Sequence, residues 1–162
     1  MKKVCSLALL CTLTLMVSQV GADVIATRVR TAAFTVPANV LINVPLNNAN
    51  SVTMPFVTTR DNQRVVINYV VECSVKSLSQ AAYMDITIFV DGVATQPTAG
   101  PNAVCTSDGN VGAVGEWVSA VVPGVYVVPE PGIHAVVLQV QLVGEVAGNF
   151  GTIGPSSMVV AQ

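Results

Sequence analysis

The sequence predicts an all-β protein, a two-sheet antiparallel sandwich of about eight strands. Val, Ile and Thr dominate the periodic runs, and Gly, Pro and Asn interrupt them about every dozen residues. No long stretch carries apolar residues at helical spacing. A jelly roll is preferred to an immunoglobulin-like sandwich, because the latter places a tryptophan between two cysteines and Trp117 follows Cys105.

The first residues have the plan of a secretory signal. Lys2 and Lys3 precede a charge-free apolar stretch, Val4–Val20, and small residues at the following cleavage site end at Ala22. We therefore expect residues 1–22 to be removed from a secreted or periplasmic protein. The alternative is a membrane anchor, although the stretch is at the short limit for a span of about 20 residues.

Residues 23–162 then form one domain with few charges. Loss of the two signal lysines leaves five basic and nine acidic residues, a balance of −4, which gives no basic surface for nucleic acid. Only 10% of the whole chain is charged and 52% is hydrophobic. Either much of this apolar content is buried in a core, or some of it forms a surface for a partner.

The strands expected before residue 96 are separated by polar turns. Pro45 and Pro55 indicate edge strands or strand ends, and Asp91-Gly92 suits a turn with positive φ. The expected strands are Val24–Val36 (in one or two pieces), Val40–Leu46, Val52–Thr58, Arg64–Val75, Met84–Val90 and a short return at Val93–Thr95.

The stretch "RVVINYVVECSVKS" is the most regular of these strands. Its alternate residues form an apolar row that we expect to face the core, with a cysteine in it. The row comprises Val65, Ile67, Tyr69, Val71, Cys73 and Val75.

A long loop, Gln96–Gly115, separates this half from the second, and its length argues that it has a function or structure of its own. Pro123-Gly124 and "PEPG" are expected turns, and "GEVAGNFGTIGPSS" is an expected glycine-rich connection. The strands expected here are Glu116–Val122, Val125–Val128, Ile133–Val143 and Met158–Ala161.

Two cysteines remain after the signal is removed. Cys73 and Cys105 in an exported chain predict one disulfide, the alternatives being buried free thiols or thiols paired between chains. In the chain-entropy model such a link stabilises by about 3–4 kcal/mol. We expect it to pin the long loop.

The sequence lacks a recognisable catalytic set, so we expect no enzyme. His134 is the only histidine, and it lies in an apolar row of a strand, where a structural role is the better interpretation. Nitrogen and sulfur ligands are too few for zinc, and we expect no cofactor. A pair of carboxylates for glycoside hydrolysis depends on spacing that sequence alone does not reveal.

The candidate ligand residues lie around the long loop. Ser107, Asp108 and Asn110 form the best local cluster of oxygen ligands, although "DGN" is also an ordinary turn. Trp117 and Tyr126 are a candidate binding platform, although core packing is the interpretation we favour for them.

The strings "RVVINYVVECSV", "YMDITIFVDGVATQPTAGPNAVCT", "EWVSAVV", "PGIHAVVLQVQL" and "SSMVV" resemble small exported bacterial domains of unassigned function. Their layout is similar to the jelly-roll sandwich of the complement C1q and tumour-necrosis-factor kind. That resemblance implies a homo-oligomer, a trimer by analogy of fold, and partner binding through exposed faces and loops. It implies no role for any particular residue here.

We therefore expect a secreted, non-enzymatic β-sandwich that acts by binding a protein or glycan partner or by assembly. One alternative is a fimbrial or adhesin-type subunit completed by strand exchange. Another is a small carbohydrate- or calcium-binding module.

Overall fold

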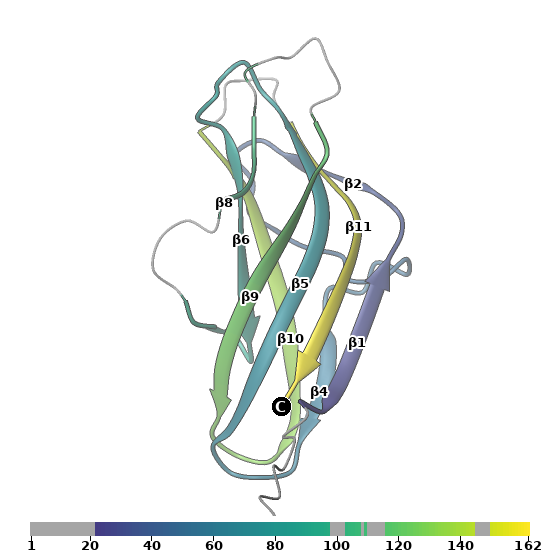
Figure 1. Cartoon of the computed structure of the whole chain (residues 1–162), viewed down its shortest axis with the longest axis vertical. Coiled ribbons are helices and arrows are strands. Elements are labelled where there is room, and N and C mark those ends of the chain that lie inside the picture. The colour runs from purple at the N-terminus through teal and green to yellow at the C-terminus, as the bar shows by residue number, and fades with distance from the viewer. Residues whose placement is uncertain (1–21, 98–102, 108, 110–115, 145–149) are drawn as a thin grey trace, which may run out of the picture.

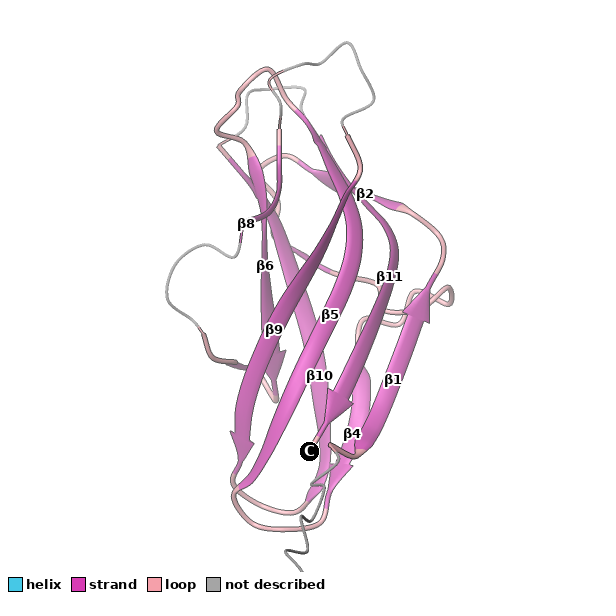
Figure 2. Cartoon of the chain, viewed as in Figure 1, coloured by secondary structure: helices cyan, strands magenta, loops and turns pink. Residues whose placement is uncertain are grey.

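The structure is a computed structural model that describes residues 22–97, 103–107, 109, 116–144 and 150–162 (Figure 1). Within these ranges the regular structure is entirely β, which confirms the predicted class (Figure 2). Apart from Ala22, the expected signal segment lies outside them. No helix long and apolar enough to cross a membrane occurs among the described residues.

Eleven strand segments occupy the described ranges. They are β1 (Val24–Arg30), β2 (Phe34–Pro37), β3 (Ile42–Asn43), β4 (Met54–Thr58), β5 (Gln63–Lys76), β6 (Tyr83–Val90), β7 (Val93–Ala94), β8 (Ala103–Thr106), β9 (Val118–Val128), β10 (Gly132–Val143) and β11 (Phe150–Ala161). The expected first strand is therefore two pieces, β1 and β2.

The strands form two antiparallel sheets that pack as a sandwich. Sheet A has the order β1–β11–β5–β9, with β2 also on β11; sheet B has the order β3–β10–β6–β7, with β4 also on β10 and β8 also on β6. In Figure 1 sheet A lies in front of sheet B.

Three edge strands are interrupted, so the eleven segments fill only eight strand positions in the described chain. β1 and β2 pair with successive parts of β11. β3 and β4 do the same along β10, as do β7 and β8 along β6. The prediction of about eight strands is confirmed in this sense, four in each sheet. Broken edges also limit unwanted pairing with other chains.

The core lies between the sheets and is built from the alternating rows. The predicted inward row of β5, Val65 to Val75, is at most 2% exposed at every position. Four residues of the row in β10, from Val136 to Leu142, are equally buried and face it from sheet B. Period-two alternation therefore identified correctly these two inner strands, one from each sheet.

The predicted turn at Pro123-Gly124 is wrong, because β9 runs straight through it. β9 is an edge strand, and Val125 directs its N–H and C=O away from β5 to Gln96, at 2.8 and 2.9 Å. The backbone nitrogen of Pro123, two residues earlier, lies on the same side of β9, away from β5. The proline therefore removes no hydrogen bond between β9 and β5. A Cβ on Gly124 would lie 2.6 Å from Oγ1 of Thr95, so this position is glycine to admit a neighbour.

The last strand is longer than predicted. β11 begins at Phe150, so the second half of the expected glycine-rich connection is strand, with a bulge between Ile153 and Ser156. A Cβ on Gly151 would lie 2.6 Å from Sδ of Met84. Close approach of side chains, not turn formation, requires glycine here.

Cys105 does not lie in an irregular loop as expected. It belongs to β8, where it pairs with Met84 of β6 at the edge of sheet B. β8 has only four residues, too few for a clear alternating pattern in the sequence.

Candidate binding face

The outer face of sheet A carries a row with exposed valines on three of its four strands. Val29 of β1, Ser157 of β11, Val70 of β5 and Val121 of β9 lie in register. The three valines are 61%, 43% and 59% exposed, respectively. An outer sheet face is normally the solvated side of an antiparallel sandwich, so this row is the first candidate for a contact surface.

We define the outer face of sheet A by β5. It comprises the alternate residues from Arg64 to Glu72 and the residues of β1, β11 and β9 in register with them. Along β5 the charges stand at the two ends, and Val66, Asn68 and Val70 lie between them. Neither Arg64 nor Glu72 has an ion-pair partner within the described chain.

A shallow hollow of about 260 Å³ lies at the Glu72 end of this face. The bulge in β11 displaces Pro155 here, and hydroxyl groups surround an exposed carboxylate. The outward lining comprises Val29, Thr31, Val70, Glu72, Ser119, Pro155 and Ser157.

Trp117 lies at the same end of sheet A and is 48% exposed. Its ring covers Gly154, where a Cβ would lie 2.6 Å from Cζ3 of the indole. Tyr126 is partly buried against the core and pairs with the inward residue Val65. The expectation of core packing therefore holds for Tyr126 and is wrong for Trp117, and the two rings do not form one platform.

Ser107 is a buried structural residue. Its Oγ donates to the carbonyl of Ser77 at 2.8 Å and accepts from the N–H of Gly109 at 3.0 Å. Asp108 and Asn110, the other members of the predicted cluster, lie outside the described residues. Among the described side chains, no group of three or more His, Cys, Asp or Glu is placed to hold a metal ion.

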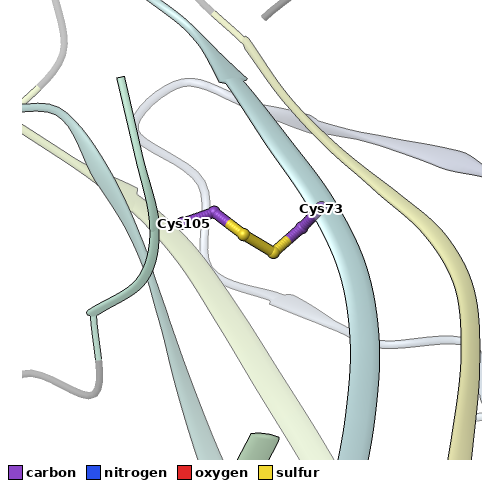
Figure 3. The surroundings of a disulfide bond; sticks show 2 residues. All are labelled: Cys73 and Cys105. Atoms are coloured by element: carbon purple, nitrogen blue, oxygen red, sulfur yellow. A yellow bond between two sulfur atoms is a disulfide. The ribbon is translucent and has the colours of Figure 1, made fainter. Parts of the chain in front are cut away.

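A disulfide joins Cys73 and Cys105, as the cysteine count predicts (Figure 3). Their Cα atoms are 6.1 Å apart, within the usual range. Because Cys73 is in β5 and Cys105 in β8, the bond links sheet A to sheet B instead of pinning an irregular loop. It is consistent with an oxidising compartment.

His134 and Asp91 form a pair that sequence reasoning missed. Nδ1 of His134 lies 2.7 Å from Oδ2 of Asp91, and Oδ1 of Asp91 accepts from the N–H of Ala135 at 2.9 Å. Asp91 has φ of +50°, at the turn between β6 and β7. The pair fastens this turn to the start of β10. The two residues are 43 positions apart, so the Asp91-Gly92 turn was the only signal in the sequence.

Arg30 is a second structural residue that sequence reasoning missed. Its guanidinium is buried and donates to the carbonyls of Ala32 and Asn47, each at 2.6 Å, and to Oδ1 of Asn50 at 3.0 Å. It also lies over the ring of Phe34. These bonds tie the turn after β3 to the end of β1.

A second hollow of about 500 Å³ lies where β1 and β4 meet, beside the strongly exposed Ile133. It is apolar, but it is not bordered by charges that would orient a partner: its lining is Ile25, Pro55, Phe56, Val57, Thr59, Ile133 and Gln162.

Searches against protein-family models and against curated proteins found no match to this chain.

Proposed function

We propose that this protein is an exported, non-enzymatic β-sandwich that acts by binding or assembly through the outer face of sheet A. The observation that carries the proposal is the exposed row of Val29, Val70 and Val121, which lies in register across the sheet. Exposed apolar surface in register over several strands is costly in water and is typical of contact surfaces.

The outer face of sheet B makes the contrast clear. Its central row is polar: Asn43, Gln139 and Thr87 are in register, and Nε2 of Gln139 donates to Oδ1 of Asn43 at 3.3 Å. The exposed apolar residues of sheet B, Val57 and Ile133, pair at one end of its outer face, whereas those of sheet A lie in a row across the strands. This asymmetry supports sheet A as the side that is used.

Export is supported by two independent features. The disulfide between Cys73 and Cys105 is stable in an oxidising compartment. The first 22 residues have the layout of a secretory signal. Together they favour a secreted or periplasmic protein.

The strand order supports a jelly roll as the form of the sandwich. With collinear pieces counted as one strand, the chain visits the sheets in the order A, B, A, B, B, A, B, A. Only the link from β6 to β7 joins neighbours in one sheet, as expected when two Greek keys share two sheets. The resemblance to complement C1q and tumour-necrosis-factor domains, with the trimer it implies, stays a prediction.

The pairing of β11 favours contact through a face over completion by strand exchange. β11 is bonded on one side to β1 and β2 and on the other to β5. In the described part of sheet A, the strand position that a donated strand would fill is therefore occupied by β11 of the chain itself.

A carbohydrate site is the second candidate, because the hollow beside Glu72 combines a carboxylate with hydroxyl groups near the half-exposed Trp117. Thermal shift against a glycan panel tests it, with Trp117→Ala and Glu72→Gln as variants. A shift that both variants remove would favour this candidate; a panel without any response would eliminate it.

The leading proposal is tested on the exported fraction of producing cells, where the native mass of the protein is measured by size exclusion with light scattering. Val70→Lys with Val121→Lys should convert a species larger than one chain to a monomer. Thr87→Lys with Gln139→Lys is the matched control on sheet B and should leave the mass unchanged. A monomeric wild-type protein in that fraction would refute binding of a macromolecule through this face.

A further inference from the structure

We infer that the occupant of the outer face of sheet A is a second copy of this chain, packed face to face about a twofold axis that passes over Asn68 of β5. The inference rests on the proposed function and names its partner. It follows from the placement of charges, the distribution of valines and the size of the face.

The charges on β5 select an antiparallel arrangement. Arg64 and Glu72 lie four residues on either side of Asn68, and both point outward. A twofold axis between the sheets and perpendicular to β5 places Arg64 of one copy opposite Glu72 of the other, twice. An axis parallel to β5 would instead place like charges opposite each other, which costs several kcal/mol.

The geometry tolerates the twist of the sheets. Facing sheets pack about 10 Å apart, with their strands rotated by about 30°. Four residues from the axis, or about 13 Å, this rotation separates the two β5 strands sideways by about 7 Å. A long arginine side chain covers that distance to the facing carboxylate.

The same axis places apolar rows opposite each other. Val66 and Val70 are symmetric about Asn68, so each faces the other across the interface. The row of Val70 and Val121 then lies over the partner's row of Val66 and Val125. On β5 the polar side chain between the two valines is Asn68, whose amide can pair with its symmetry mate.

The face is large enough for a reversible dimer. Nine residues of β5 span about 30 Å, and four strands span about 19 Å. The resulting area, about 600 Å² per copy, is at the lower end for specific interfaces, which bury about 1,200–2,000 Å² in total. An area at this lower end, with ion pairs only at its rim, suits a reversible dimer more than a permanent one.

Charge exchange tests this arrangement by sedimentation of the purified, disulfide-bonded protein. Arg64→Glu and Glu72→Arg should each weaken dimerisation by roughly a hundredfold, because each places two pairs of like charges in contact. The double variant Arg64→Glu/Glu72→Arg should restore it to within about fivefold of wild type. Arg60→Glu, an exposed position in the turn before β5, is the matched control and should dimerise like wild type.

Circular dichroism and thermal unfolding of each variant confirm that it is folded. A wild-type protein that stays monomeric at several hundred micromolar overturns the inference, as does a double variant no better than the singles. A third outcome separates the two proposals: the purified protein is monomeric, but the exported fraction contains a larger species that Val70→Lys/Val121→Lys abolishes. This result would refute dimerisation and would support binding of another partner through the outer face of sheet A.

Discussion

At the scale of single residues, polar side chains fix the ends of the sandwich. Arg30 is bound entirely to backbone and amide oxygens, and Asp91 holds both His134 and the backbone of Ala135. Loss of the Arg30 guanidinium would remove all three of its hydrogen bonds, and loss of the Asp91 carboxylate would remove its bonds to His134 and to the N–H of Ala135. Polar residues therefore position the turns, whereas valines build the sheets.

Tyr69 is the buried group whose titration affects stability most clearly. Desolvation in the core raises its pKa to about 12. Ser156 and Arg30 lie near enough to oppose this shift. No well-aligned hydrogen bond reaches the Tyr69 hydroxyl, so desolvation prevails. The Tyr69 hydroxyl ionises near pH 10 in the unfolded chain and near pH 12 in the folded chain. Its contribution to the free energy of unfolding is therefore fully present below pH 10 and decreases as the pH rises above 10.

We predict that the free energy of unfolding falls by about 1 kcal/mol between pH 9 and pH 11 because of Tyr69. Urea unfolding at each pH measures it. Tyr69→Phe removes the hydroxyl without a change of shape, so it should abolish this slope and change stability at pH 7 by less than about 1 kcal/mol. An unchanged slope in the variant would show that another group is responsible.

At the scale of elements, the strands that the sequence predicts best are those with the longest alternation. β5 and β10 were identified by their apolar rows, because both are central strands with one face on the core. The errors lie in the edge strands β8 and β9 and in the inner strand β11. Pro123 is tolerated in β9 because β5 needs no hydrogen-bond donor at that position. The glycines in β11 leave space for neighbouring side chains. Both features depend on contacts between residues that are distant in the sequence.

The candidate site was harder to predict than the fold. Trp117 was named as a possible binding residue, but its position over Gly154 depends on where β11 passes. The valine row became visible only when register brought Val29, Val70 and Val121 together. In the sequence these are single β-branched residues within strands, where they are expected in any case.

The disulfide acts between elements of different sheets, and we predict a corresponding loss when it is removed. Cys73→Ala with Cys105→Ala should lower the free energy of unfolding by about 3–4 kcal/mol. In hydrogen exchange, protection should decrease first in β8, which has only four residues and lies at an edge. Chemical reduction of the wild-type protein is the control. Unchanged exchange in β8 would contradict the role of the bond as a link between sheets.

At the scale of the whole molecule, the sandwich has two outer faces of different character. The face of sheet B has a central polar row from Asn43 to Thr87, whereas that of sheet A has exposed valines on either side of Asn68, between Arg64 and Glu72. A chain with only 10% charged residues places an apolar row on one side instead of distributing charge over both. This asymmetry is the physical basis of the function by contact that we propose.

Hydroxyl-radical footprinting of the protein in its native exported state tests this claim most directly. Labelling is compared with that of dilute purified protein, using Val70 and Val121 on the face and Val93 and Ile133, which are exposed elsewhere. We predict that Val70 and Val121 are protected at least threefold in the native state, while Val93 and Ile133 are labelled equally in both samples. Equal labelling of Val70 and Val121 in the two samples would contradict the use of this face.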